Sequence, residues 1–142
     1  MSKVCVFTIV AAMGLSACFS SPLHAAEQDK SVIGKWKLTK VLDSSEISAL
    51  DDNDAERLVG QVLRISEKEV RLGQRTCKEP DFEVTRAEKN EYFRRNAHAS
   101  AEKLGLPNPV TAVHINCTYV YKKTPGRIVV HWKGVFFDAV RK

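Results

Sequence analysis

The sequence lacks the short motifs that carry most enzyme and cofactor chemistry. It has no Gly-x-Ser-x-Gly elbow, no phosphate-binding loop and no His-Glu-x-x-His zinc motif. A cluster of acids at 51–56 is missing the glycine and the final glutamate of a calcium loop, so helix capping explains it better. These absences lead us to expect no metal and no cofactor, and they favour a binding protein over an enzyme.

Long apolar segments are also absent, apart from one at the N-terminus. Residues 4–15 are almost entirely apolar, follow the basic Lys3, and give way to Ser20-Ser21-Pro22. The run is too short to span a bilayer, which needs roughly 20 apolar residues. A basic start followed by a short apolar run is typical of a secretory signal peptide, and it predicts export to the periplasm.

Two processing schemes fit this leader. Cleavage near Ala25 or Ala26 removes residues 1–26 and releases a soluble chain that starts with a linker at 27–31. Alternatively, Leu15-Ser16-Ala17-Cys18 resembles the bacterial lipobox, in which the cysteine becomes the lipidated first residue. Residues 1–17 are then removed, and a lipid on Cys18 is the one membrane attachment.

Cysteine is scarce outside the leader. Only Cys77 and Cys117 follow Cys18, and they lack the C-x-x-C spacing of a redox or zinc motif. An isolated pair in an oxidising compartment is most simply a disulfide, here one that closes a loop of about 40 residues. We therefore predict a Cys77–Cys117 bridge in a domain of modest size.

Charge of one sign is not concentrated anywhere. The net charge of +5 is spread over the chain, and no basic run exceeds two adjacent residues. Export argues against nucleic acid as a partner, and a basic surface favours an acidic protein or an anionic envelope component.

Alternating apolar and polar residues predict a mainly β, antiparallel domain over residues 32–142. About seven strands are expected, together with a short helix at 51–59 that an aspartate can cap. The expected strands are 34–42, 62–66, 69–72, 82–85, 111–121, 127–133 and 135–141. Because sequential hairpins dominate, we expect the sheet to close into a barrel, which would remove its exposed edges.

Residues 86–104 allow two arrangements. Phe93, Ala97, Ala101 and Leu104 lie near one helical face, which fits a helix after a capping box at 85–88. Alternatively, residues 91–94 extend the preceding strand, and only 100–104 are helical. We expect the second arrangement, so the domain would have one or two short helices.

Gly34-Lys35-Trp36 at the start of the first strand resembles the Gly-x-Trp motif of lipocalins and lipocalin-like domains. The resemblance implies a barrel-like fold in which the tryptophan plugs one end beneath an arginine from near the last strand. Arg141 or Arg127 would take that part. It also implies one alternative function, the carriage of a small apolar ligand.

Histidines are the candidates for catalysis. His114 and His131 are expected on adjacent strands, where they would face each other, and Asp138 is a nearby carboxylate in the sequence. No third ligand accompanies them, so a metal site is not expected. A periplasmic hydrolase using His114 and His131 is the enzyme alternative.

The tip of the C-terminal hairpin is the predicted binding surface. Tyrosine and arginine anchor many interfaces because they bring a large contact area at small entropic cost. The alternation equally allows both tyrosines to be core residues on the face of Cys117. The predicted residues are Tyr119, Tyr121, Lys122, Lys123 and Arg127. We expect a non-enzymatic binding protein, such as an inhibitor or immunity protein that recognises another protein.

Overall fold

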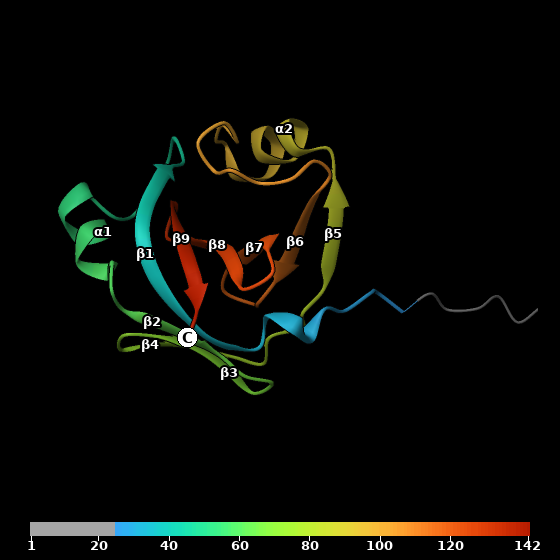
Figure 1. Cartoon of the computed structure of the whole chain (residues 1–142), viewed down its shortest axis with the longest axis horizontal. Helices are drawn as coiled ribbons and strands as arrows, with labels where there is room; N and C mark the ends of the chain where they lie inside the picture. The colour runs from blue at the N-terminus through green and yellow to red at the C-terminus, as the bar shows by residue number, and fades with distance from the viewer. Residues whose placement is uncertain (1–24) are drawn as a thin grey trace, which may run out of the picture.

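The computed structural model describes residues 25–142, which form one strongly curled β-sheet (Figure 1). Within these residues the sheet has nine antiparallel strands in the order β4-β3-β2-β1-β9-β8-β7-β6-β5. The signal peptide and the lipidation site at Cys18 lie outside the described residues. The strands are β1 Gly34–Ser44, β2 Val62–Ile65, β3 Glu69–Leu72, β4 Arg75–Lys78, β5 Val84–Ala87, β6 Val110–His114, β7 Tyr119–Thr124, β8 Arg127–Trp132 and β9 Val135–Arg141.

Short helices connect the strands. Asp51 caps α1 (Asp52–Leu58) by accepting a hydrogen bond from the Asp54 N–H, as the sequence predicts. The other helical segments are η1 Lys30–Val32, α2 Lys89–Tyr92 and η2 Phe93–Ala97, the last a π-helix. Residues 25–142 include no helix with the length and apolar character that a membrane span requires.

The mainly β, antiparallel prediction is confirmed, but the closed barrel of about seven strands is wrong. The sheet is an open half-barrel, because its two outer strands, β4 and β5, do not pair with each other. Instead, Gln28 bridges Glu83 beside β5, and residues 27–31, expected as a linker, lie against the domain. The sequence analysis missed β4 because most of its residues are exposed and it lacks an apolar alternation.

The predicted long strand at 111–121 is two strands. β6 and β7 form a hairpin, in which Val113 lies opposite Val120 and His114 opposite Tyr119. Asn116 turns the chain with a φ of 74°, a left-handed conformation that asparagine tolerates better than most residues. The β-forming residues on both sides of this turn gave the appearance of one continuous run.

Residues 89–97 are helical, so the strand extension expected over 91–94 and the helix expected at 100–104 are both wrong. The alternative of a helix after residues 85–88 is nearer to the structure, although Thr85 lies in β5 and the helix ends at Ala97. Glu88 begins α2 by accepting hydrogen bonds from the Asn90 and Glu91 N–H groups. Phe93 then lies fully buried in η2, where it packs against Tyr121 at 4.8 Å between ring centroids. Burial of this aromatic face favours the helix over an extended segment.

The core has two parts on opposite faces of the sheet. One cluster combines residues of β1, β2 and β3 with residues of β6, β7, β8 and β9, which only the concave face of a curled sheet can bring together. The second cluster joins residues of β6–β9 to α2, η2 and residues 97–106. Val129 and Val130 are adjacent in β8 and belong to different clusters, so the second cluster lies on the convex face.

The predicted disulfide between Cys77 and Cys117 is present, with 6.0 Å between the two Cα atoms. It joins β4 to the turn between β6 and β7, and so links strands from the two ends of the sheet. Asn116 reinforces this link by donating a side-chain hydrogen bond to the Lys78 carbonyl. The bridge therefore holds the curl across the gap that the unpaired edge strands leave.

Replacing both cysteines, Cys77→Ser with Cys117→Ser, should lower the free energy of unfolding by about 3–4 kcal/mol. Without the bridge, the unfolded chain has the conformational entropy that closing a loop of about 40 residues removes. Urea unfolding of the oxidised protein, the reduced protein and the double variant measures this, and the last two should agree. Equal stability of the oxidised protein and the variant would contradict the role of the bridge in holding the curl.

Candidate functional site

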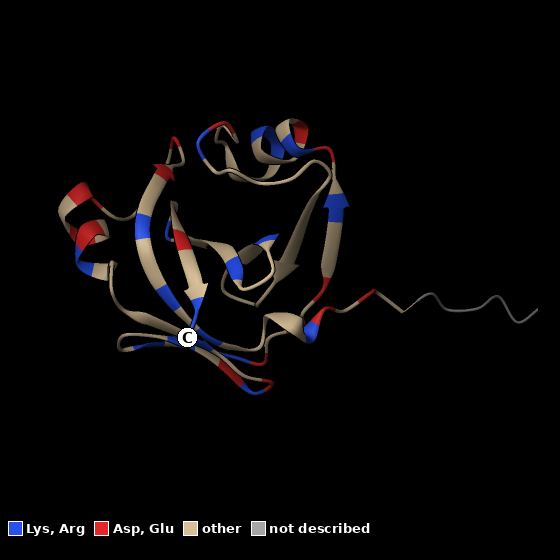
Figure 2. Ribbon diagram, viewed as in Figure 1, with Lys and Arg blue, Asp and Glu red and all other residues tan. Residues whose placement is uncertain are grey.

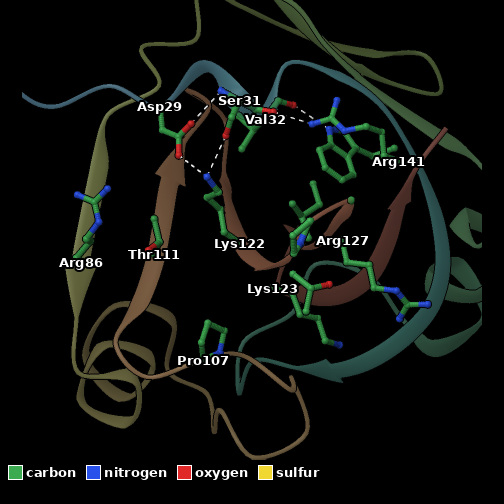
Figure 3. A pocket seen from close by; sticks show the side chains of 15 residues that line it. Asp29, Ser31, Val32, Arg86, Pro107, Thr111, Lys122, Lys123, Arg127 and Arg141 are labelled. Carbon is green, nitrogen blue, oxygen red and sulfur yellow. Dashed lines mark hydrogen bonds and ion pairs between the residues drawn. The ribbon is translucent and has the colours of Figure 1, made fainter.

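A hollow of about 510 Å³ lies beside the turn that joins β7 to β8. Figure 3 shows it between the start of β1, the strands β5 and β6, and the β7–β8 hairpin. Buried Val32, Trp36 and Ile128 give it an apolar floor, while basic side chains stand around it. An apolar floor with a few convergent polar groups is the usual composition of a ligand site.

One row of residues across the sheet forms a wall of this hollow. Arg86 of β5 pairs with Thr111 of β6, and Lys122 of β7 pairs with Ile128 of β8. Ala112 lies opposite Tyr121, so Thr111 lies opposite Lys122 in the same register. Neighbours across strands share a face, so the sheet itself holds the two cations at a fixed spacing.

A further cation, Arg141, closes the end of the hollow near β1. The Arg141 guanidinium lies 4.2 Å from the centroid of the Trp36 ring, and it donates hydrogen bonds to the carbonyls of Ser31 at 2.7 Å and Ile33 at 3.0 Å. Trp36 in turn donates from Nε1 to the Val32 carbonyl at 2.8 Å. The tryptophan–arginine contact that the sequence motif predicts is therefore formed, and Arg141 makes it.

Two acids of the N-terminal segment already pair with the cations of the wall. Glu27 binds Arg86 through both carboxylate oxygens, at 2.6 and 2.8 Å. Asp29 accepts a hydrogen bond from Lys122 Nζ at 2.8 Å, and Lys122 also reaches the Ser31 hydroxyl at 3.0 Å (Figure 3). No carboxylate of the described residues is within ion-pair distance of Arg141.

These contacts shift the acidity of both carboxyl groups. Partial burial opposes ionisation of Asp29, but hydrogen bonds from Lys122 and Ser31 outweigh it and lower its pKa to about 2. The hydrogen bond and charge of Arg86 likewise lower the pKa of Glu27. Both acids are therefore ionised at neutral pH, so the cations of the wall bind two carboxylate anions of the same chain.

Of the predicted binding residues, Lys122, Lys123 and Arg127 line the hollow, and only Lys122 of these pairs with Asp29. Lys123 and Arg127 both pair with Asp138, each at 3.3 Å, and follow the parity of the convex face. Tyr121 is 1% exposed and belongs to the convex-face core, as the alternative interpretation of the hairpin allowed. Tyr119 is 37% exposed and packs on the His114 ring at 4.9 Å.

The sequence analysis did not identify Arg86, Glu27 or Asp29 as site residues. Arg86 belongs to a short strand with little alternation, and its partner Glu27 is 59 residues away in the sequence. The two acids fell in a segment that was taken for a linker. The spacing of Glu27 and Asp29, one residue apart, was the available signal, since alternate residues of an extended segment share a side.

The expected face-to-face arrangement of His114 and His131 is wrong, because β7 lies between β6 and β8. His114 instead contacts both carboxylate oxygens of Asp81 at 2.9 Å through Nδ1. His131 stacks on Phe136 at 4.2 Å, and its Nε2 lies 3.3 Å from the Ser45 hydroxyl. Residues 25–142 contain no group of His, Cys, Asp and Glu side chains placed to hold a metal ion.

The Ser45–His131 contact pairs a hydroxyl with an imidazole, as a catalytic nucleophile and base would be paired, but the imidazole lacks the basicity that catalysis needs. Burial of His131 lowers its pKa to about 4, so the ring is a weak base at neutral pH. The N–H groups next to Ser45 are also engaged, because Ser45 donates to the Gly134 carbonyl and Glu46 to the His98 carbonyl. The contact therefore fastens the loop after β1 onto the β8–β9 turn.

Comparisons with known proteins identify no relative. No protein-family model, no curated protein and no solved structure matches the chain. The likeness to lipocalins accordingly remains one of a motif and of a curled antiparallel sheet.

The buried neutral His131 predicts a pH dependence of stability. Its pKa is about 4 in the folded protein against 6.5 ordinarily, so between these values the unfolded chain binds more protons. Stability should therefore fall as the pH decreases from about 6.5 to about 4. After allowance for partial exposure, the loss relative to His131→Gln is about 2 kcal/mol between pH 7 and 4.5.

Denaturant unfolding of the native protein and His131→Gln at both pH values measures this difference. The variant is the reference because other histidines and the carboxylates titrate equally in both proteins. An unchanged difference between the two pH values would mean that the ring is not buried in its neutral form.

Proposed function

We propose that this protein is an exported, non-enzymatic binding protein that recognises an acidic region of a partner protein through the cationic hollow. The observation that carries the proposal is the placement of Arg86, Lys122 and Arg141 around one apolar-floored hollow, with two of them already bound to carboxylates. The periplasm is the proposed compartment. The Cys77–Cys117 disulfide supports it, because such bridges persist in oxidising compartments.

The charge distribution supports an acidic partner. Basic residues occur on most strands around the curl, and acidic residues are prominent on α1 and at several turns (Figure 2). Several cations around one hollow attract an acidic partner and raise its association rate. An inhibitor or immunity protein is the kind of binding module that fits this size and a bridged, rigid scaffold.

Rigidity supports binding as the role of this scaffold. The cations come from strands rather than from free loops, and the disulfide and the Arg141 contacts fix the elements that carry them. A preorganised surface loses little conformational entropy when its partner binds, so more of the contact energy appears as affinity.

The two alternatives receive less support. A hydrolase would need His131 as a base, and its pKa of about 4 makes it a poor one at neutral pH. A carrier of a purely apolar ligand would have to displace the water that solvates the charged side chains around the hollow, which is costly.

Neutralising two cations, Arg86→Gln with Lys122→Gln, should reduce capture of the partner from an envelope extract at least tenfold. The matched control is Lys37→Gln with Lys40→Gln, which removes the same charge from exposed positions of β1. Chemical cross-linking followed by mass spectrometry identifies and quantifies the captured protein. The control should retain capture, because surface substitutions away from the hollow leave the contact intact.

Equal capture by both double variants would exclude the hollow as the binding site. Equal loss in both would show that only the overall charge matters. Circular dichroism of each variant checks that the sheet is unchanged.

A further inference from the structure

The N-terminal segment Glu27-Gln28-Asp29 lies along one side of the hollow, which Asp29 lines, and contacts the cations there as an acidic ligand would. It lies extended and antiparallel to the chain that leads into β5, with Gln28 bridging Glu83. The Val84 N–H donates to the Glu27 carbonyl and the Asp29 N–H to the Phe82 carbonyl, both at 2.9 Å. The segment therefore adds a short strand to the edge of the sheet.

The side chains of this segment also contact the site as those of a ligand would. Glu27 and Asp29 are separated by one residue, so in an extended chain both project to the same side. Glu27 takes Arg86 and Asp29 takes Lys122, the two cations that the sheet holds in one row. The site thus combines three features: the edge of a strand, two cations at a fixed spacing, and carboxylates separated by one residue.

The attachment of the segment is weak enough to be exchanged. Its backbone is held by one bridge with two flanking hydrogen bonds, and its side chains by the Gln28 bond to the Asp81 carbonyl and the two ion pairs. Glu27 is 61% exposed, and an exposed ion pair contributes only about 0–1 kcal/mol, so the 16% exposed Asp29 makes the stronger of the two side-chain attachments. Arg141 and Trp36 hold the carbonyls of residues 31–33 independently of residues 27–29, although Asp29 also caps η1 by accepting a hydrogen bond from the Ser31 N–H. Residues 27–29 can therefore leave while the backbone of residues 31–33 stays in place.

We infer that the hollow and the adjoining edge of β5 bind an extended acidic segment with an acid-x-acid pattern, and that residues 27–29 occupy this site as an internal competitor. The inference rests on the proposed function and specifies the part of the partner that is recognised. Strand addition supplies affinity through backbone hydrogen bonds, and the side-chain sites supply selectivity. Internal occupancy lowers the apparent affinity in proportion to the fraction of molecules whose site is free.

The test uses a peptide taken from the chain itself, residues 26–31 with both ends blocked and a fluorescent label. Its affinity is measured by anisotropy for the mature native protein and for Glu27→Gln with Asp29→Asn. The asparagine keeps a side-chain oxygen that can accept the capping hydrogen bond from the Ser31 N–H. With Arg86 and Lys122 released from carboxylates, the variant should bind the peptide at least fivefold more tightly than the native protein.

Two controls separate occupancy from overall charge. Asp52→Asn with Glu56→Gln makes the same charge change on α1, which packs outside β1, away from the N-terminal segment (Figure 1). This control should bind the peptide like the native protein. A peptide with glutamine and asparagine in place of its two acids should lose the affinity, and added salt should weaken the binding of the acidic peptide.

The inference is overturned if the site variant binds no more tightly than the native protein, if both double variants gain equally, or if the acidic peptide binds none of the three proteins. The proposed function has a separate outcome. If partner capture depends on Arg86 and Lys122, the proposed function holds whatever the peptide experiment gives. If that capture is absent, the proposed function fails, but the peptide affinities still test the inference.

Discussion

The contact of Arg141 with Trp36 holds together the end of the sheet on which the rest of the site depends. Two side chains engage three consecutive carbonyls, those of Ser31, Val32 and Ile33, and so fix the chain between the N-terminal segment and β1. A cation over an indole ring adds about 0.5–2 kcal/mol, depending on how dry the contact is. Gly34 leaves room for it, because a Cβ there would lie 2.5 Å from the Arg141 Nη1.

This anchor explains how an open sheet keeps a defined hollow. A curled sheet with unpaired outer strands must be held across its gap, and here the disulfide links β4 to the β6–β7 turn while the N-terminal segment covers part of the edge near β5. Edge strands left free invite pairing with other chains. In this molecule the covered edge, the paired cations and the apolar floor meet at one place, which is the site proposed to bind an acidic segment.

The sequence predicted those parts of the structure that depend on local patterns. The alternation from Gly34, the cap at Asp51, the β2–β3 hairpin and the glycine turn before Arg127 each follow from a few neighbouring residues. The cysteine pair was predictable because only one pairing was available. The turn at Asn116 was not, since it interrupts a run of β-forming residues without glycine or proline.

The parts that could not be predicted depend on long-range packing. Whether the sheet closes depends on which strands pair with β4 and β5, and no local sequence pattern predicts that pairing. Arg86 contacts Glu27, which is 59 residues away, and Lys123 pairs with Asp138, and neither contact has a local signal in the sequence. The hollow lies at the hairpin proposed from the sequence, where Lys122, Lys123 and Arg127 line it, and their role in binding stays a prediction.

Amide hydrogen exchange of Asp29 and Val84 tests the central claim most directly. In the free protein both amides donate to backbone carbonyls across the same bridge, so both should exchange more slowly than amides without a hydrogen bond. When an acidic segment replaces residues 27–29, the Asp29 amide should lose its protection, while the Val84 amide, which then donates to the ligand, should keep it. Exchange of both amides that stays unchanged when the acidic peptide saturates the protein would contradict the account.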